Sequence, residues 1–419
     1  MAKDEPAPNV PNAAKLALDM QMRTRKEHNF SKVEEDLLDP RPIQTNTLTV
    51  SSLRSKLGFF NPFAKKTVSR GDLVWLFDNT AFRHSRMSSW QAEFVTAVFE
   101  KESANRLVDL AASIARIVGL ADDAKERETI EQRLQPFAWD IRVGRNAVIS
   151  QEGSRKTIKL GATGSEGCSS DVINISSHGK GSFVRASAVV TGGIEGILDM
   201  QTYYAGEDGW AIISDIDDTI KVTMTSDPIG ILKETFINEP RPIDGMPELY
   251  TQIKAMLPKD TPWFYLSASP YTLYPFLKEF RNKFYPPGTM ILRDSSWRTI
   301  SGLLASLTMV TEEYKVDRMK KVNSWLPKKK LIVFGDSTQS DPEAYGEIYR
   351  TFPGWISLIF IRKATDVAMF GIGEKNDPER FEKAFEGIPD DVWHVFEDPK
   401  DCVATIKNKV GSKWGIPGL

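Results

Sequence analysis

Three carboxylates and a threonine follow directly after a short apolar run near the middle of the chain. The run covers residues 211–214, and the polar residues after it are Asp215, Asp217, Asp218 and Thr219. A short continuous apolar run is typical of a fully buried strand, and open α/β sheets bind ligands just beyond the carboxyl ends of their strands. Asp215 is therefore placed as a nucleophile. Because crowded acids repel one another, we expect a divalent cation beside them.

Two later apolar runs also end in small or acidic polar residues. Residues 263–266 lead into Ser267, and residues 331–334 lead into Gly335 and Asp336, with Asp341 shortly after. Lys315 lies between these two runs in the sequence. The spacing predicts three buried strands that each end in small or acidic polar residues, at the edge where open α/β sheets bind ligands.

This set of features, in this order, resembles the haloacid dehalogenase superfamily of phosphohydrolases. That superfamily has an Asp-x-Asp-x-Thr motif, a Ser or Thr at a strand end, a Lys that opens a helix, and a Gly-Asp element followed by another Asp. The matching positions here are Asp215 to Thr219, Ser267, Lys315, and Gly335 and Asp336 with Asp341.

The resemblance implies a role for each of these residues. Phosphoryl transfer needs a nucleophile, a proton donor and positive charge on the non-bridging oxygens. Asp215 would attack phosphorus and form an aspartyl-phosphate. Asp217 would protonate the leaving oxygen and then activate the hydrolytic water. Thr219 would orient Asp217 or hydrogen-bond to nearby backbone, while Ser267 and Lys315 would hold the phosphoryl oxygens.

Mg²⁺ is the cofactor that this chemistry implies. Asp215, the main-chain carbonyl of Asp217 and Asp336 would bind the ion, and waters and a phosphate oxygen would complete an octahedron. Asp341 would be a second carboxylate at the metal or would fix the metal-bound waters. The four histidines are scattered without metal-ligand spacing, and two cysteines cannot form a cysteine-based zinc site.

Each motif also has a purely structural interpretation. Asp-rich turns after strands are common, and a Gly-Asp-Ser sequence alone is a weak turn signal. Lys315 could simply face solvent, as could the nearby Lys320 and Lys321. The occurrence of all four motifs in order is what favours a phosphatase.

Composition and charge bound the remaining possibilities. The chain has 419 residues, which is more than one typical domain, with 41% hydrophobic and 26% charged residues, ordinary values for a soluble globular protein. The net charge of −2 gives no global field that would attract nucleic acid. The N-terminus lacks an apolar signal core, and two cysteines exclude a disulfide framework. We therefore expect a cytoplasmic protein with reduced thiols.

The pattern of apolar runs predicts an α/β fold in several parts. Residues 1–65 form an N-terminal extension, partly disordered or helical, and residues 66–206 form a mostly antiparallel, sandwich-like β domain that carries helices. Residues 207–370 form a catalytic domain that resembles the haloacid dehalogenase fold, a doubly wound parallel sheet, and residues 371–419 close it with helices near 378–385 and 399–409. The strands of the parallel sheet are expected at 210–214, 263–267, 289–292, 330–334 and 356–361.

The intervals between the motifs leave no room for a large cap domain, so the site would admit bulky substrates. Two segments could contact a membrane: the aromatic and basic residues 59–66, and an apolar flap at 228–237 beside Lys221 and Lys233. Either segment could instead pack on its own domain. Arg293 and Arg298 could bind phosphate oxygens or form surface ion pairs.

Longer stretches around the motifs are similar to the fungal actin-patch phosphatidate phosphatase family. These stretches are residues 210–223, 264–270, 292–294 and 334–345, with 73–83 and 133–137 in the N-terminal half. The resemblance implies Mg²⁺-dependent conversion of phosphatidate to diacylglycerol at a membrane surface, peripheral association with membranes, and contact with endocytic proteins at cortical actin patches. Members can carry a Pro-rich tail that binds SH3 domains. No such tail precedes Leu419, so we do not expect recruitment by that route.

Two alternative functions remain open at this stage. One is a phosphatase of the same mechanism that acts on a soluble or protein phosphomonoester. The other is a non-enzymatic membrane or cytoskeletal adaptor with a vestigial site. The intact set of Asp215, Asp217 and Asp336 argues against the adaptor, because a vestigial site has no chemical reason to keep all three.

Overall fold

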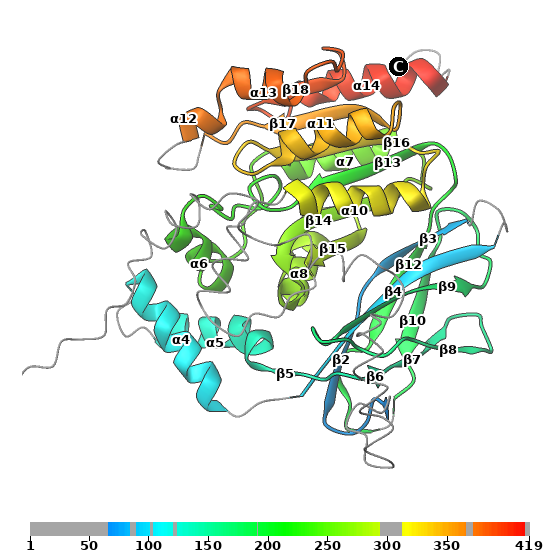
Figure 1. The fold of residues 1–419 in the computed structure, drawn as a ribbon, viewed down its shortest axis with the longest axis vertical. Coiled ribbons are helices and arrows are strands. Elements are labelled where there is room, and N and C mark those ends of the chain that lie inside the picture. The colour runs from blue at the N-terminus through cyan, green and yellow to red at the C-terminus, as the bar shows by residue number, and fades with distance from the viewer. Residues whose placement is uncertain are drawn as a thin grey trace, which may run out of the picture.

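A mixed α/β architecture holds the motif residues. The computed structural model describes residues 66–83, 89–100, 104–119, 124–190, 192–293, 312–365 and 372–414. These residues form a six-stranded parallel sheet, a ten-stranded and mostly antiparallel sheet, and a short parallel pairing of β1 (Lys66–Thr67) with β6 (Arg145–Asn146) (Figure 1). The predicted α/β class is confirmed at this level.

The parallel sheet contains every strand predicted for the catalytic domain. Its strands in chain order are β13 (Trp210–Asp215), β14 (Trp263–Pro270), β15 (Thr289–Arg293), β16 (Lys330–Asp336), β17 (Ile356–Arg362) and β18 (Trp393–Phe396). The spatial order is β15-β14-β13-β16-β17-β18, and every pairing is parallel. The sequence analysis missed β18, a four-residue strand that lies between the two helices predicted near 378–385 and 399–409.

Helices connect these strands and cover the sheet. Asp227 caps the first helix by accepting a hydrogen bond from the Ile229 backbone N–H at 3.0 Å, and Pro228 starts it with a preset φ. The helices are α6 (Pro228–Phe236), α7 (Met246–Met256), the 3₁₀ turn η1 (Tyr271–Leu273), α8 (Tyr274–Phe284), α10 (Glu312–Trp325), α11 (Asp341–Thr351), α12 (Ile372–Lys375), α13 (Pro378–Ala384) and α14 (Asp401–Trp414). The predicted C-terminal helices are thus present as α13 and α14.

The β-rich part is built around one long strand, β4 (Trp90–Glu100), which pairs with β2 (Asp72–Leu76), β3 (Asn79–Arg83), β5 (Asp140–Ile141) and β9 (Cys168–Ile175). The remaining strands are β7 (Val148–Gln151), β8 (Thr157–Lys159), β10 (Phe183–Ala188), β11 (Glu195–Ile197) and β12 (Asp199–Tyr204). Hydrogen bonds join all ten strands into one sheet rather than two. The pairings of β11 with β2 and of β12 with β3 are parallel.

Two helices, α4 (Ala104–Val118) and α5 (Ala124–Ala138), interrupt the β-rich part. α5 contains Pro136 close to its C-terminal end. Pro136 lies in the last turn, where its missing N–H removes one helical hydrogen bond. Both helices contact α6 of the other half of the chain, and Phe137 packs edge-on against Phe236 with ring centroids 5.7 Å apart.

The two halves of the chain share their hydrophobic core. Trp75 and Phe99 from the antiparallel sheet belong to the same buried cluster as Trp210 and Tyr274. At a second place Phe82 of β3 stacks on Trp325 of α10 with ring centroids 5.3 Å apart. The parallel sheet is therefore supported by the β-rich part, while a domain boundary at residue 206 remains a prediction.

The apolar segment after the first motif packs inward. Ile231, Leu232 and Phe236 of α6 are fully buried, and Lys221 is buried beside them. Ile229 is 38% exposed. These side chains therefore pack on the core rather than forming a flap that presses into a bilayer. Residues 59–65 and Arg298, for which membrane or phosphate contacts were considered, lie outside the described residues. Among the described helices, none combines the length and the apolar character that are needed to span a bilayer.

Candidate active site

The predicted site residues meet at one edge of the parallel sheet. β13 ends at Asp215, β16 ends at Asp336, and Ser267 lies near the end of β14. Asp215 is paired in register with Leu266, directly before Ser267. Because all three strands are parallel, their carboxyl ends project polar side chains into the same space.

A buried cluster of opposite charges occupies this edge. Lys315 of α10 places its Nζ 2.8 Å from Asp215 Oδ1 and 2.5 Å from Asp341 Oδ1. Oxygens of Asp215, Asp336 and Asp341 all lie within 4.8 Å of one another, and across the described residues no other group of three such side chains could hold a metal ion. Lys315, Asp215, Asp336 and Asp341 are all at most 1% exposed. The cluster is therefore part of the interior and not a solvated turn.

Lys315 is the lysine that reaches this site. Its neighbours in the sequence, Lys320 and Lys321, bind Glu347 and Glu93 instead. Burial alone would lower the pKa of Lys315, but the attraction of Asp215, Asp341 and Asp336 is larger and raises it. Lys315 is thus held as a cation between the carboxylates of Asp215 and Asp341.

Burial and crowding hold the pKa of two carboxyls above the usual range. For Asp215, burial raises the pKa well above its ordinary value, Lys315 opposes this, and Asp341 and Asp336 add to it. For Asp336, burial and the nearby Asp341 raise the pKa to about 6, while Lys315 opposes the shift. One lysine does not neutralise three acids, so the set has the oxygen donors and the negative charge that a divalent cation prefers.

A tight turn brings Asp341 back toward the end of β16. Asp341 Oδ2 accepts a hydrogen bond of 3.1 Å from the backbone N–H of Asp336. A side chain at position 335 would place its Cβ 2.5 Å from Asp341 Cβ, so this close approach requires Gly335. Asp341 is therefore fixed by Lys315 and by backbone, which favours a role in fixing its neighbours over a role as a freely available second metal carboxylate.

Hydroxyl groups surround the Asp217 carboxylate. Ser267 Oγ donates to Asp217 Oδ2 at 2.5 Å, Ser269 Oγ donates to the same oxygen at 3.1 Å, and Thr223 Oγ1 donates to Oδ1 at 2.9 Å. Ser267 thus contacts the candidate acid/base directly, in addition to its predicted role toward phosphate. Ser269 and Thr223 were not recognised from the sequence, although Ser269 follows the same strand.

Thr219 has a different partner from the one expected. Its Oγ1 donates to Asp215 Oδ2 at 3.0 Å and lies 3.4 Å from Asp336 Oδ2. The expectation that Thr219 orients Asp217 or binds backbone is therefore wrong. One turn of backbone after Asp215 brings the Thr219 hydroxyl back to the Asp215 carboxylate, and Thr223 lies beside Asp217 instead.

Asp218 organises the loop after the first motif, a role that the sequence analysis did not assign. Its backbone is left-handed, with φ of 57°, a conformation that Asp adopts more readily than most residues. Its carboxylate accepts hydrogen bonds from the backbone N–H groups of Thr223 at 2.9 Å, Met224 at 2.8 Å and Thr225 at 2.7 Å. Arg362 donates to the Asp218 carbonyl at 2.8 Å. This loop therefore holds Thr223 against Asp217.

Two cations from the C-terminal helices fasten the loop after Asp336. Arg380 donates to the carbonyls of Ser337 at 2.6 Å and Gln339 at 2.5 Å and forms an ion pair with Glu343 at 2.8 Å. Lys375 donates to the carbonyl of Thr338. No motif spacing links residues 375 and 380 to the earlier motifs, so the sequence carried no signal for this contact.

Arg293, a candidate phosphate ligand, ends β15 in an interior position. It is 3% exposed, and its guanidinium lies 5.1 Å from the centroid of the Tyr314 ring. The alternative of a surface ion pair is therefore wrong, and Arg293 packs over the start of α10.

The segment that holds these residues is similar in sequence to known proteins. Residues 210–363 match the family described as "Phosphatidate phosphatase APP1, catalytic domain". Phosphatidate phosphatase APP1 of Saccharomyces cerevisiae is 34% identical over 162 residues, which are 38% of this chain and 27% of that protein. An uncharacterized protein of Schizosaccharomyces pombe is 28% identical over 158 residues, 37% of this chain and 25% of that protein. The chain thus matches about a quarter of the length of each of these curated relatives.

The matched segment contains the whole cluster described above. It starts at the first residue of β13 and ends one residue beyond β17, so it includes Asp215, Asp217, Ser267, Lys315 and Asp336. Residues 210–363 of this chain are therefore similar to the catalytic domain of the phosphatidate phosphatase APP1 family.

Proposed function

We propose that this protein is a Mg²⁺-dependent phosphatidate phosphatase that works through an aspartyl-phosphate on Asp215. The observation that carries the proposal is the buried contact of Asp215 with Lys315, beside Asp336 and Asp341, at the carboxyl edge of a parallel sheet. The order of the strands and the helices between them support a doubly wound fold of the haloacid dehalogenase type. The match of this segment to a phosphatase family points to the same chemistry.

The donor set fits Mg²⁺. Carboxylate oxygens are the ligands that Mg²⁺ takes in proteins, and three of them converge here in a buried space with a surplus of negative charge. Asp215 and Asp336 would hold the ion together with the main-chain carbonyl of Asp217, and Asp341 would orient the site through Lys315 and the Asp336 backbone. When bound, the ion would neutralise developing charge on the phosphoryl oxygens.

The side chains of this protein would carry the reaction in two steps. In the first, a carboxylate oxygen of Asp215 forms a bond to phosphorus, the bond from phosphorus to the glycerol oxygen breaks, and Asp217 gives its proton to that oxygen. In the second, Asp217 takes a proton from water as the water oxygen attacks phosphorus, so that phosphate leaves and Asp215 is restored. Lys315 faces the non-bridging oxygens, whose negative charge it offsets.

The hydroxyls around Asp217 suit this double role. Ser267, Ser269 and Thr223 fix both carboxylate oxygens, so that the side chain keeps one orientation as it releases and takes up a proton. Fixed geometry of this kind contributes to rate because the proton has to be delivered within hydrogen-bond distance.

The lipid substrate is proposed from the relatives and from the fold. The matched yeast protein is named a phosphatidate phosphatase, and α6 and α7 fill the interval between β13 and β14 without an inserted cap domain. Peripheral association with membranes and contact with endocytic or actin-patch proteins are also proposed, on the basis of the family resemblance. A soluble phosphomonoester is the second candidate substrate, because the charge cluster recognises phosphate whatever the leaving group is.

The test is phosphate release from phosphatidate in mixed micelles and from para-nitrophenyl phosphate, each with Mg²⁺ and with EDTA. We expect Mg²⁺-dependent release from phosphatidate by the wild type and none by Asp215→Asn. Asp244→Asn is the matched control, because it removes an exposed carboxylate by the same chemical change. Release from the soluble ester alone would keep the mechanism and discard the lipid. No phosphate release from either substrate by a folded protein would contradict the proposal.

A further inference from the structure

We propose that the β-rich part of the chain sets the position of Lys315 through Glu93, which makes Glu93 a positioning residue for phosphoryl transfer. Glu93 lies on β4, and its partner Lys321 lies on α10, the helix that carries Lys315. The inference rests on the proposed function, because the effect of Glu93 is read through the reaction that Lys315 assists.

α10 presents different residues to the site and to the β-rich part. Lys315 faces the carboxylate cluster, whereas Arg318, Lys321 and Trp325 follow one another at helical spacing along a stripe that lines the boundary with the β-rich part. At about 1.5 Å of rise per residue, Lys321 lies about 9 Å along the axis from Lys315. A helix transmits an axial shift or rotation over this length, so holding Lys321 also holds Lys315.

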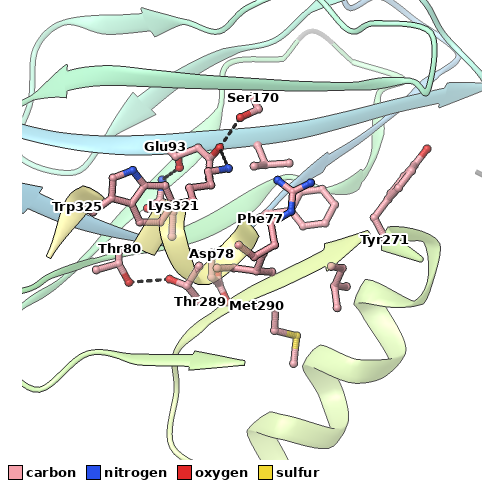
Figure 2. Close-up of a pocket in the computed structure, with 15 residues that line it drawn as sticks. Phe77, Asp78, Thr80, Glu93, Ser170, Tyr271, Thr289, Met290, Lys321 and Trp325 are labelled. Carbon is pink, nitrogen blue, oxygen red and sulfur yellow. Dashed lines mark hydrogen bonds and ion pairs between the residues drawn. The ribbon is translucent and has the colours of Figure 1, made fainter. Parts of the chain in front are cut away.

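Glu93 is a strongly held, buried anion. It is 8% exposed; Lys321 Nζ forms an ion pair with it, and Ser170 Oγ donates to its Oε1 at 2.5 Å (Figure 2). Burial alone would raise the pKa of Glu93, but Lys321, Ser170 and Arg318 outweigh burial and lower it. Glu93 therefore remains charged and keeps Lys321 in one place.

The ion pair lies where α10 meets the β-rich part of the chain. A cavity of about 40 Å³ lies at this boundary and is lined by residues of both halves, including Glu93, Lys321 and Asp78 (Figure 2). This volume is enough for about three waters. The charged contact and the stacking of Phe82 on Trp325 join α10 to the β-rich part here, while Met319 and Val322 pack α10 into the core of the parallel sheet.

Asp78 provides a matched control from the same boundary. It is 9% exposed, belongs to the same half of the chain and lines the same cavity. Its carboxylate binds Lys278 at 2.9 Å and Arg281 at 3.3 Å, both on α8. α8 carries none of the proposed site residues. Loss of the Asp78 charge thus disturbs the contact between the halves without acting on α10.

The experiment compares the wild type, Glu93→Gln, Asp78→Asn and Lys321→Met by melting temperature and by kcat and KM on phosphatidate micelles and para-nitrophenyl phosphate. We expect Glu93→Gln and Lys321→Met to lower kcat about 5- to 10-fold on both substrates, with KM changed less than twofold. Asp78→Asn is expected to lower the melting temperature about as much as Glu93→Gln does. Its kcat should stay within twofold of the wild-type value.

A double variant separates positioning from general destabilisation. In the background of Lys315→Met, Glu93→Gln should lower the residual rate by less than twofold, because the group that it positions is already gone. An equal loss of kcat in Glu93→Gln and Asp78→Asn, or an undiminished effect of Glu93→Gln without Lys315, would overturn the positioning role. A wild type inactive on both substrates would instead refute the proposed function, and the positioning role with it.

Discussion

Asp215 and Asp217 are two residues apart in the sequence, and the structure gives their carboxylates different surroundings. Asp215 faces the Lys315 ammonium and the Thr219 hydroxyl, whereas Asp217 is surrounded by the hydroxyls of Ser267, Ser269 and Thr223. A cation beside a carboxylate suits a nucleophile that approaches a charged phosphate. Hydroxyls that donate to both oxygens of Asp217 fix the orientation of a side chain that is proposed to transfer a proton.

The first expectation at this scale concerns Asp217→Asn. The amide cannot transfer a proton, so kcat should fall by about 10²-fold or more. Stability should change little, because Asn can keep a hydroxyl contact and the loss of one acid relieves repulsion with Asp215. Phosphate release and a thermal melt of the same preparation check this, with Asp244→Asn as the exposed control. Full activity in Asp217→Asn would exclude it as the acid and base.

The second expectation concerns the pH dependence of stability without metal. The pKa of Asp336 is about 6 in the folded protein and about 4 in an unfolded chain. The contribution of Asp336 to the free energy of unfolding is therefore fully present below about pH 4, and it is lost as pH rises through about 6. In EDTA, Asp336→Asn should gain about 2 kcal/mol in free energy of unfolding over the wild type between pH 4 and pH 7.

Urea unfolding of both proteins at several pH values measures this difference. Mg²⁺ should remove most of the advantage of Asp336→Asn at pH 7, because an ion that binds the folded state stabilises the wild type. A difference between the two proteins that does not vary with pH would contradict the account of a crowded, partly protonated acid cluster.

At the scale of elements, the apolar runs predicted five of the six strands of the parallel sheet, and the polar residues at the ends of three of them lie close together. Asp215, Ser267 and Asp336 lie together because parallel strands end at one edge, which period and position in the sequence can indicate. Contacts made by loops were not predictable in this way. The left-handed turn at Asp218 and the hydrogen bonds of Arg380 to the loop after Asp336 depend on how distant segments meet. No local sequence pattern encodes such contacts.

The turn between β16 and α11 gives an expectation at this scale. In Gly335→Ala the new Cβ would lie 2.5 Å from Asp341 Cβ, so Asp341 would have to move away from Lys315 and from the Asp336 backbone. Such overpacking typically costs about 1–3 kcal/mol, and kcat should fall at the same time. Gly192→Ala is the control, because a Cβ at position 192 meets nothing within 4 Å. Equal behaviour of the two variants in melting and turnover would contradict this description of the turn.

At the scale of the whole molecule, the shared core makes the two halves depend on each other. Trp75, Phe99, Trp210 and Tyr274 pack in one cluster, and Phe77 lies against Tyr274 with ring centroids 4.3 Å apart. The β-rich half contributes side chains to this shared core and contacts α10 through Glu93 and Phe82. In Figure 1 the β-rich half lies below the parallel sheet and its helices.

We therefore expect residues 207–419, expressed alone, to lack a cooperative thermal transition, since Tyr274 and Trp325 would lose the aromatic partners that cover them. Circular dichroism and binding of a hydrophobic dye measure this. The full chain should melt in one transition. A fragment 207–419 that melts cooperatively and keeps the activity of the full chain would show that the β-rich half is dispensable.

The most direct test of the central claim is to trap the phosphorylated enzyme. The protein is mixed with phosphatidate and Mg²⁺, quenched in acid within milliseconds and reduced with borohydride, which converts an acyl phosphate to homoserine. Peptide mass spectrometry then locates the converted residue. The account expects homoserine at position 215, dependent on phosphatidate and Mg²⁺ and absent in Asp215→Asn. Conversion of another carboxylate, or no conversion in an enzyme shown to be turning over, would contradict it.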